Sequence, residues 1–352
     1  MKNNAQITKI LILRSDRMGD MILSLPAISS IKESYPKAHI AILIQEYTRD
    51  ILWNNPHIDE IIIDHGQNML ELAHQIRDKK FDLAVVLYPS WRNGWLCFFA
   101  GIPVRVGTGY KPVGILFNKR AYIHRSKIVC HEIDYCLRLA EKAGARATRR
   151  ELTLRIKDED TQYAQSLLKK HGLLGNFPLI GIHPGSGGSA LNWSKDNYAC
   201  LIDGLIKKYD ARVVITGSKD EQTMIEQIIA ARGGDITHAK PVNLAGQTTV
   251  GQLMALFSLY HLFVGPSTGP MHLAAGLGKP VIALFPPLLS QSPAKWGPYG
   301  QGHVVLTPED VQCRLRKCKK GGCRFFNCID RITAERVLDV AGGIMREDRG
   351  HR

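Results

Sequence analysis

Charged residues are concentrated at the end of the first apolar run, where RSDRMGDMILSLP occupies residues 14–26. Ionised groups are costly to desolvate unless they are paired or solvated, so a buried strand-to-helix turn normally carries small, uncharged residues. An arginine fork binds phosphate or carboxylate in a bidentate manner, and a carboxylate at a strand end can accept a proton. This turn therefore predicts a site whose function needs charge.

Two later loops have the composition of phosphate-binding loops. In GPSTGPMHLAAGLGKP, Ser267, Thr268 and Gly269 stand directly before a helix start, where hydroxyls and free amides suit a pyrophosphate, and His272 lies one turn further on. The Gly-rich loop HPGSGGSALNWS at 183–194 is neither G-x-G-x-x-G nor a Walker A sequence, which argues against a dinucleotide oxidoreductase or a P-loop NTPase. Taken singly, N-capping and an ordinary helix histidine explain these residues equally well. Taken together, they favour phosphate binding.

Apolar runs alternate with helix-compatible segments along the chain. In the first half these runs lie at 7–14, 38–44, 59–65 and 81–89, and in the second half at 177–188, 211–218, 261–269 and 279–287. Continuous apolar strands that alternate with helices indicate parallel sheets covered on both faces. We therefore expect two doubly wound, Rossmann-like α/β domains, with ligands at the carboxyl ends of their strands.

The chain has 352 residues, more than one typical core, and two domains of about 150 residues each are expected. We place an N-terminal domain at 1–158, a charge-rich linker at 159–176, a C-terminal domain at 177–330 and a terminal helix and tail at 331–352. The first apolar run is too short for a signal peptide, and no stretch approaches the roughly 18 apolar residues of a transmembrane helix. We therefore expect a soluble, cytoplasmic protein.

The balance of charge is strongly basic, with a formal net charge of +14 and a pI near 9.4. Three anionic partners could account for it, namely nucleic acid, a membrane surface or a phosphorylated substrate, and an ordinary basic surface is the alternative. No RNP-like aromatic motif, helix-turn-helix pattern or Lys-rich tail is visible, and aromatic residues make up only 7%. Nucleic acid is therefore not the expected partner.

The order of several motifs resembles the heptosyltransferase family, glycosyltransferase family 9. These motifs are the opening R-x-D-R-x-G-D-x-x-x-x-x-P, HPGSGGS-x-x-NW, TGS-x-x-E, N-L-A-G-x-T and GPSTGPMHLAAGLGKP, and the similarity extends over nearly the whole chain. The resemblance implies the GT-B fold, in which two Rossmann-like domains face a central cleft. It also implies transfer of a sugar, typically heptose from ADP-heptose, to the inner core of lipopolysaccharide.

The resemblance assigns roles to residues of three motifs. It implies that Asp20, the acidic residue of the opening G-D, is the general base that takes a proton from the acceptor hydroxyl in an inverting, direct displacement. Asp16 competes for this role, and stabilisation of a helix dipole is the simpler alternative for Asp20. The resemblance also implies that Ser186 and Gly187 belong to the donor loop and that Glu221 meets the ribose or the base.

Stabilisation of the nucleoside diphosphate leaving group is expected to need neither a metal nor a cofactor. The only D-x-D sequence, Asp158 to Asp160, stands where the expected linker begins and is interpreted as solvated charge. The helix start at 267–269, His272 and a nearby cation then take the place of a metal. The sequence therefore favours metal-independent transfer.

Two positions depart from the pattern of lipopolysaccharide heptosyltransferases. Those enzymes often have Lys where this chain has Leu191 and Asp where it has Ser267. Both changes remove charged donor contacts, and Lys195 is the candidate for restoring the positive charge. The alternative function is therefore transfer from another nucleotide sugar in O-antigen, capsule or glycoprotein synthesis. A sugar-nucleotide sensor and a nucleic-acid-binding protein are the alternatives from other classes.

The expected acceptor is a lipopolysaccharide core or another glycolipid, reached by peripheral contact at the cytoplasmic face of the inner membrane. The arginines of the opening turn, Arg14 and Arg17, suit its phosphates and sugar acids. Arg92 and Lys111, in WRN and GYK at expected strand ends of the same domain, are further candidates. An ordinary basic surface is the alternative for all four residues.

The cysteines fall into two groups. Four have apolar or helical neighbours and are expected to be buried thiols: Cys97, Cys130, Cys136 and Cys200. The other four are evenly spaced in CRLRKCKKGGCRFFNC: Cys313, Cys318, Cys323 and Cys328. Four thiolates among basic residues can hold zinc, but structural zinc sites usually have two close pairs separated by a longer loop. Reduced thiols are therefore favoured over a structural metal, and disulfides are not expected.

Overall fold

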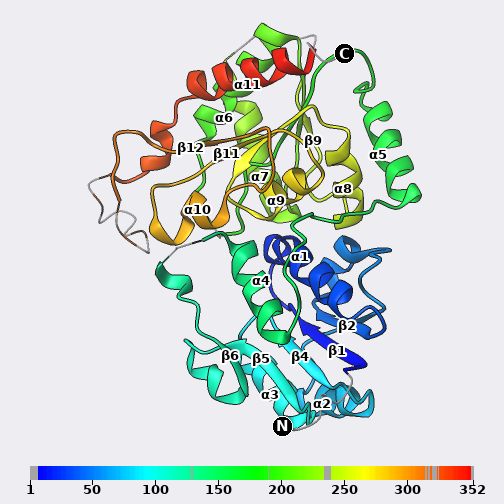
Figure 1. Cartoon of the computed structure of the whole chain (residues 1–352). Helices are drawn as coiled ribbons and strands as arrows, with labels where there is room; N and C mark the ends of the chain where they lie inside the picture. The colour runs from blue at the N-terminus through cyan, green and yellow to red at the C-terminus, as the bar shows by residue number, and fades with distance from the viewer. Residues whose placement is uncertain are drawn as a thin grey trace. The chain divides into compact units, whose positions relative to one another are not determined.

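The computed structural model describes residues 7–127, 130–188, 190–233, 239–313, 315, 318, 323 and 325–349. The chain forms two compact units, a first that ends at Arg155 and a second that begins at Ile156 (Figure 1). Each unit contains one six-stranded sheet in which every strand pair is parallel. The prediction of two doubly wound α/β domains is therefore confirmed.

The first unit alternates strands and helices from β1 to α4. Its strands are β1 Lys9–Leu13, β2 His39–Ile44, β3 Glu60–Ile63, β4 Leu83–Val86, β5 Val104–Thr108 and β6 Lys119–Ala121. Its α-helices are α1 Met18–Ser34, α2 Met69–Asp78, α3 Trp91–Phe99 and α4 Glu132–Ala143, and its 3-10 helices are η1 Glu46–Leu52, η2 Pro112–Leu116 and η3 Arg125–Lys127. The strands are ordered β3-β2-β1-β4-β5-β6.

The apolar residues of β1 bury both faces of this sheet, because side chains alternate along a strand. Leu11 and Leu13 pack in one core with Leu72 of α2 and Leu96 of α3. The intervening isoleucines, such as Ile12, are equally buried and face the other side, which α1 and α4 cover (Figure 1). A strand that is buried on both faces has a continuous run of apolar residues, and this run is why β1 could be predicted from the sequence.

The second unit repeats this pattern from α5 to α11. Its strands are β7 Leu179–Ile182, β8 Arg212–Ile215, β9 Val242–Asn243, β10 Leu262–Pro266, β11 Val281–Leu284 and β12 His303–Leu306. Its α-helices are α5 Asp158–Lys170, α6 Lys195–Tyr209, α7 Gln222–Ala230, α8 Val250–Ser258, α9 Gly269–Gly276, α10 Pro293–Trp296 and α11 Ala334–Arg349. Its 3-10 helices are η4 Lys219–Glu221, η5 Leu289–Gln291 and η7 Cys328–Arg331, and the strand order is β12-β11-β10-β7-β8-β9.

The segment that we assigned to a linker is mostly helical and belongs to the second unit. Helix α5 buries Ala164, Leu167 and Leu168, whose spacing places them on one helix face, and it packs against α8. The acidic residues of the D-x-D sequence lie in its first turn, where they suit the helix dipole. The division between the units therefore falls at Arg155, a few residues before the expected boundary.

Helix α11 closes the second unit at the end of the chain. It packs on α6, where a Cβ at Gly204 would lie 2.6 Å from Leu338. The expected terminal helix is therefore part of the core of this unit. Among the residues that the structure describes, no helix has the length and apolar character to cross a membrane.

Candidate functional site

Both sheets have the same strand order, 3-2-1-4-5-6, when the strands of each unit are numbered along the chain. In such sheets, ligands bind outside the carboxyl ends of the strands at the switch point, where the direction of connection reverses. The switch point lies between β1 and β4 in the first unit and between β7 and β10 in the second. The charged turn after β1 and the loops after β7 and β10 therefore all begin at a switch point.

Arg14, the first residue after β1, is at the centre of the charged turn. Its side chain is only 1% exposed. Its Nη2 donates to Asp20 Oδ1 at 2.7 Å, its Nε to the main-chain oxygen of Asp20 at 3.1 Å, and its Nη1 to that of Leu87 at 3.0 Å. Burial opposes its charge, but the carboxylates of Asp16 and Asp20 outweigh burial and raise the pKa of Arg14. Arg14 is thus fixed on Asp20, and its burial argues against the acceptor contact that we expected.

Asp20 and Asp16 flank this guanidinium in different environments. Asp20 lies in the first turn of α1, where the helix dipole favours a carboxylate, and its side chain is 22% exposed. The side chain of Asp16 is 13% exposed, and its Oδ1 lies 3.1 Å from Arg14 Nε. Burial and the charge of Asp20 outweigh the effect of Arg14 and raise the pKa of Asp16 to about 7. The turn therefore combines an anchored carboxylate with one that binds a proton near neutral pH.

Charges from distant parts of the chain join this cluster. Glu132, in the first turn of α4, has its Oε1 3.8 Å from Arg14 Nη2 and also forms an ion pair with Arg125. Burial and Arg125 lower the pKa of Lys111, against the opposing effects of Glu132 and Asp16. Lys111 therefore lies close enough to Glu132 and Asp16 to interact with them electrostatically. We did not anticipate Glu132, because no local pattern links a residue in α4 to the turn after β1.

The two remaining basic candidates of the first unit, Arg17 and Arg92, differ in whether their side chains are available to bind an anionic ligand. Arg17 is the exposed N-cap residue of α1. Arg92, in the first turn of α3, donates its Nε and Nη2 to the two carboxylate oxygens of Asp64 at 2.8 and 2.7 Å. Its Nη2 also donates to the main-chain oxygen of Gln67 at 2.9 Å. The fork of Arg92 is occupied within the protein, so its expected role as an acceptor contact has no support in this structure.

His183, the first residue after β7, was not among the expected site residues. Its side chain is buried, its Nδ1 lies 2.9 Å from Thr216 Oγ1, and its Nε2 lies 3.9 Å from Glu221 Oε2. Burial lowers the pKa of His183 to about 4, although Glu221 opposes this shift. The imidazole is therefore neutral near pH 7 and adds hydrogen-bonding capacity without charge. Its position directly after an apolar run was the signal that could have identified it.

Glu221 lies against the Gly-rich loop, as a donor-site residue should. Its Oε2 accepts a hydrogen bond from the main-chain nitrogen of Ser218 at 2.8 Å, which caps the start of η4. A Cβ at Gly185 would lie 1.9 Å from Glu221 Oε1. Only a residue without a side chain allows this approach, so the structure brings together two motifs that are well separated in the sequence.

The Gly-rich loop itself is held by local contacts. Ser186 Oγ donates to the main-chain oxygen of Ala190 at 3.0 Å. Gly187 has a φ of 51°, a left-handed conformation that glycine adopts without steric cost. Lys195 lies outside this loop, exposed in the first turn of α6, and hydrogen-bonds to Gln227 of α7. The structure therefore gives no support to Lys195 as the replacement for a charged donor contact.

Strand β10 leads directly into α9 at the second expected phosphate loop. Thr268 is the N-cap residue of α9, but its side chain does not cap the helix, and its hydroxyl donates to the main-chain oxygen of Pro266 at 3.3 Å. Gly269 begins the helix, Ser267 is half-buried before it, and His272 is buried one turn in. The main-chain nitrogens of Met271 and His272 donate to the main-chain oxygen of Thr268 at 3.1 and 3.3 Å, and Pro270 has no N–H group. The amide that this helix start offers to an anion is therefore that of Gly269.

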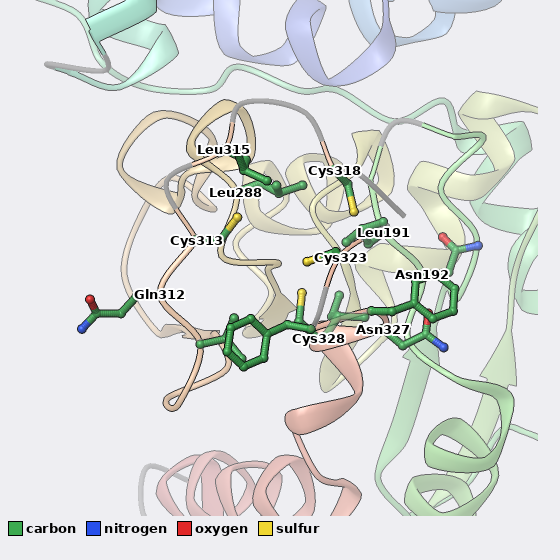
Figure 2. Close-up of a pocket in the computed structure, with 14 residues that line it drawn as sticks. Leu191, Asn192, Leu288, Gln312, Cys313, Leu315, Cys318, Cys323, Asn327 and Cys328 are labelled. Atoms are coloured by element: carbon green, nitrogen blue, oxygen red, sulfur yellow. The ribbon is translucent and has the colours of Figure 1, made fainter. Parts of the chain in front are cut away.

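The four evenly spaced cysteines line one cavity of about 250 Å³ in the second unit. Figure 2 shows Cys313, Cys318, Cys323 and Cys328 around the same space, which Leu191 also borders. Burial and the three neighbouring thiols raise the pKa of Cys328. Among the described residues, no three His, Cys, Asp or Glu side chains are arranged to hold a metal ion. All six basic residues between these cysteines lie outside the described residues.

The other cysteines are less uniformly buried than we predicted. Cys97 and Cys136 are buried, and burial raises the pKa of each thiol to about 12. Cys130 is half-buried, whereas Cys200 is exposed. The prediction is wrong for Cys200, because this residue lies on the outer face of α6 rather than on the face that packs on the sheet.

Comparisons with known proteins extend over both units. A model of the family described as glycosyltransferase family 9 (heptosyltransferase) matches residues 69–325. A putative glycosyltransferase of Haemophilus influenzae is 30% identical over 312 residues, which cover 85% of this chain and 89% of the relative. Lipopolysaccharide heptosyltransferase 2 of Escherichia coli is 28% identical over 356 residues, covering 97% and 99% of the two chains. The structure of E. coli ADP-heptose lps heptosyltransferase II has a TM-score of 0.81 at 25% identity, covering 97% of this chain and 100% of that one.

Proposed function

The chain belongs to glycosyltransferase family 9 and is a glycosyltransferase of the GT-B fold, and we propose that it transfers heptose from ADP-heptose to a lipopolysaccharide core acceptor. The proposal includes inversion at the anomeric carbon and independence of a divalent metal. The names of the similar E. coli protein, lipopolysaccharide heptosyltransferase 2, and of the similar solved structure, ADP-heptose lps heptosyltransferase II, support the donor and the acceptor. The observation that carries the chemistry is the pairing of Asp20 with a buried arginine at a switch point.

Asp20 is the proposed general base. Arg14 Nη2 holds its carboxylate in place at the start of α1, where it can accept a proton from the acceptor hydroxyl. The hydrogen bond from Arg14 uses Oδ1 and fixes the carboxylate, which leaves Oδ2 for the acceptor. Attack of that hydroxyl on the anomeric carbon, with departure of ADP, inverts the configuration in one displacement.

The second unit is proposed to bind the nucleotide and to stabilise its departure. The N–H group of Gly269 and the helix dipole of α9 suit the diphosphate, with Ser267 and Thr268 before this helix start and His272 one turn inside. Ser186, Gly187 and Glu221 belong to the adjoining donor loop, and Glu221 is proposed to contact the ribose or the base. A helix start then supplies the stabilisation that a metal provides in other transferases.

The first unit is proposed to bind the anionic acceptor through exposed cations. Arg17 and Lys111 are the candidates, because Arg14 is buried and Arg92 is occupied by Asp64. The net charge of +14 favours approach to an anionic glycolipid at the inner face of a membrane. Substituting Arg17 or Lys111 by alanine should raise the KM for the acceptor more than that for the donor.

The decisive assay combines a metal chelator with a panel of nucleotide sugars and truncated lipopolysaccharide acceptors. We expect acceptor-dependent release of ADP from ADP-heptose, a product of inverted anomeric configuration by NMR, and loss of activity in Asp20→Asn. The matched control is Asp82→Asn. The carboxylate of Asp82 accepts hydrogen bonds from Thr8 and Lys9 at the amino ends of β1 and β4, away from the switch point. Full activity of the Asp20 variant would refute the assignment of the base, and a strict Mg²⁺ or Mn²⁺ requirement would refute the metal-free mechanism.

A different nucleotide sugar remains the second candidate donor. Leu191 and Ser267 stand where lipopolysaccharide heptosyltransferases often carry Lys and Asp, and Leu191 borders an apolar cavity. If the enzyme releases another nucleoside diphosphate from this panel faster than it releases ADP from ADP-heptose, it is still a glycosyltransferase, but its donor is that other nucleotide sugar.

A further inference from the structure

The charged turn holds one more carboxylate than the base mechanism uses. Asp16, Asp20 and Glu132 all lie within 3.8 Å of the Arg14 guanidinium. Glu132 has a second partner in Arg125, whereas Asp16 and Asp20 share Arg14. Two carboxylates on one cation leave an excess of negative charge, which is relieved when one of them binds a proton.

Arg14 does not divide its hydrogen bonds evenly between these two carboxylates. Its Nη2 and Nε both donate to Asp20, to the side chain and the main chain respectively, and its Nη1 donates to Leu87. Asp16 Oδ1 is close to Nε, at 3.1 Å, but it is buried and accepts no hydrogen bond from the described residues. An ionised oxygen in this position lacks the donors that would offset its burial. Asp16 is therefore the member of the pair that takes up the proton.

The other groups around Asp16 leave this assignment unchanged. Tyr47 donates its hydroxyl to the main-chain oxygen of Asp16 at 3.0 Å, so it does not stabilise the carboxylate directly. Lys111 and Glu132 act on it electrostatically with opposite signs. Burial and Asp20 raise the pKa of Asp16 to about 7, so its protonation state changes within the range in which a cytoplasmic enzyme works.

We propose that Asp16 is a positioning residue that tunes the base, so that its ionised form strengthens Asp20 as a proton acceptor and its protonated form weakens it. This inference rests on the proposed function, in which Asp20 takes the acceptor proton. A negative charge next to Asp20 disfavours a second negative charge there, which raises the proton affinity of Asp20. Uptake of a proton from water by Asp16 removes this effect, so transfer slows as the pH falls through neutrality.

The test is the pH dependence of kcat/KM in the wild type and in Asp16→Asn. Asparagine resembles the protonated form of Asp16, so the variant should match the wild type near pH 5.5 and be slower by about tenfold near pH 8.5, where it lacks the negative charge beside the base. Asp16→Glu restores a titrating carboxylate and should recover the pH-dependent ratio. The control Asp82→Asn should keep the profile of the wild type. A ratio between wild type and Asp16→Asn that does not change with pH would indicate a merely structural role and overturn the proposal.

Two further measurements separate this proposal from the assignment of the base. If Asp20→Asn retains the activity of the wild type, the proposed function fails and the role of Asp16 fails with it. If Asp20→Asn is inactive but the ratio for Asp16→Asn is flat, only the role of Asp16 fails. Independently of activity, ¹³C NMR of protein labelled at the aspartate carboxyls should show one signal, absent from Asp16→Glu, that titrates near neutral pH. Titration of that signal below about pH 5, the range of an ordinary aspartate, contradicts the proposal.

Discussion

Replacing Arg14 by methionine should destabilise the first unit in a pH-dependent manner. The substitution keeps a long side chain in a position that is 1% exposed, but it removes the cation between Asp16 and Asp20. Removal of one partner from a buried ion pair typically costs about 3–5 kcal/mol, because the remaining charge is left in a poorly solvated site. We therefore expect the free energy of unfolding to fall by about this amount near pH 8.

The sign of the pH effect follows from the direction of the pKa shifts. A carboxyl group whose pKa is higher in the folded than in the unfolded state destabilises the fold at high pH, and the penalty shrinks as the pH falls from the folded pKa towards the unfolded pKa. In the wild type, Asp16 already has a pKa of about 7. Arg14 lowers the pKa of Asp16, so loss of Arg14 raises the pKa of Asp16 further. Between about pH 8 and pH 5.5 the difference between wild type and variant should shrink by about 1 kcal/mol or more.

The measurement is urea-induced unfolding of the full chain at these two pH values. Arg105→Met in β5 is the matched control, because the guanidinium of Arg105 donates to the main-chain oxygens of Leu116 and Ile102 rather than to carboxylates. Its loss should destabilise the protein equally at both pH values. A loss for Arg14→Met below about 1 kcal/mol, or one that is the same at both pH values, would refute the account of the charged turn.

Three other substitutions or reagents test the second unit and the thiols. Gly185→Ala should weaken ADP binding about fivefold or more in calorimetry, since its Cβ would displace the Glu221 carboxylate, and unchanged affinity would separate Glu221 from the donor site. Leu191→Lys should lower the free energy of unfolding by about 1–3 kcal/mol without tightening ADP-heptose binding, because position 191 borders an apolar cavity. In the reduced native protein, Ellman's reagent should modify all cysteines except Cys97 and Cys136. If four further thiols are protected from the reagent, and a chelator abolishes that protection, a structural metal is favoured instead.

Most of the strands that the sequence predicted are buried on both faces, and the exception is the partly buried edge strand β3, whose residues still form an apolar run. Strands such as β1 and β10 consist of continuous apolar residues, so their type and position could be read directly. The unpredicted strands are β5, β6, β9 and β12, three of which are short and stand at or near a sheet edge. Edge strands need fewer apolar residues, and β5 is interrupted by Arg105, so the periodicity that marks a buried strand is missing there.

The candidate site was only partly predictable for a related reason. Motifs that follow a strand directly, such as those after β1, β7 and β10, are local in the sequence, and the parallel topology alone brings them to the switch points. The partners of the basic residues are not local. Arg92 meets Asp64 and Arg14 meets Glu132 only in the folded chain, so the sequence could not indicate which arginines remain available for a ligand.

The two units share a strand order but differ in the turn that follows their first strand, and this difference indicates a division of chemical roles. After β7 the chain continues as HPGSGG, in which glycines such as Gly187 allow a ligand phosphate to approach main-chain N–H groups. After β1 the chain continues as RSDRMGD, whose side chains fill the equivalent position and hold charge there. The carboxylates of Asp16 and Asp20 disfavour a phosphate beside the backbone at this position. Proton transfer therefore fits the first switch point and diphosphate binding the second, although the same topology builds both.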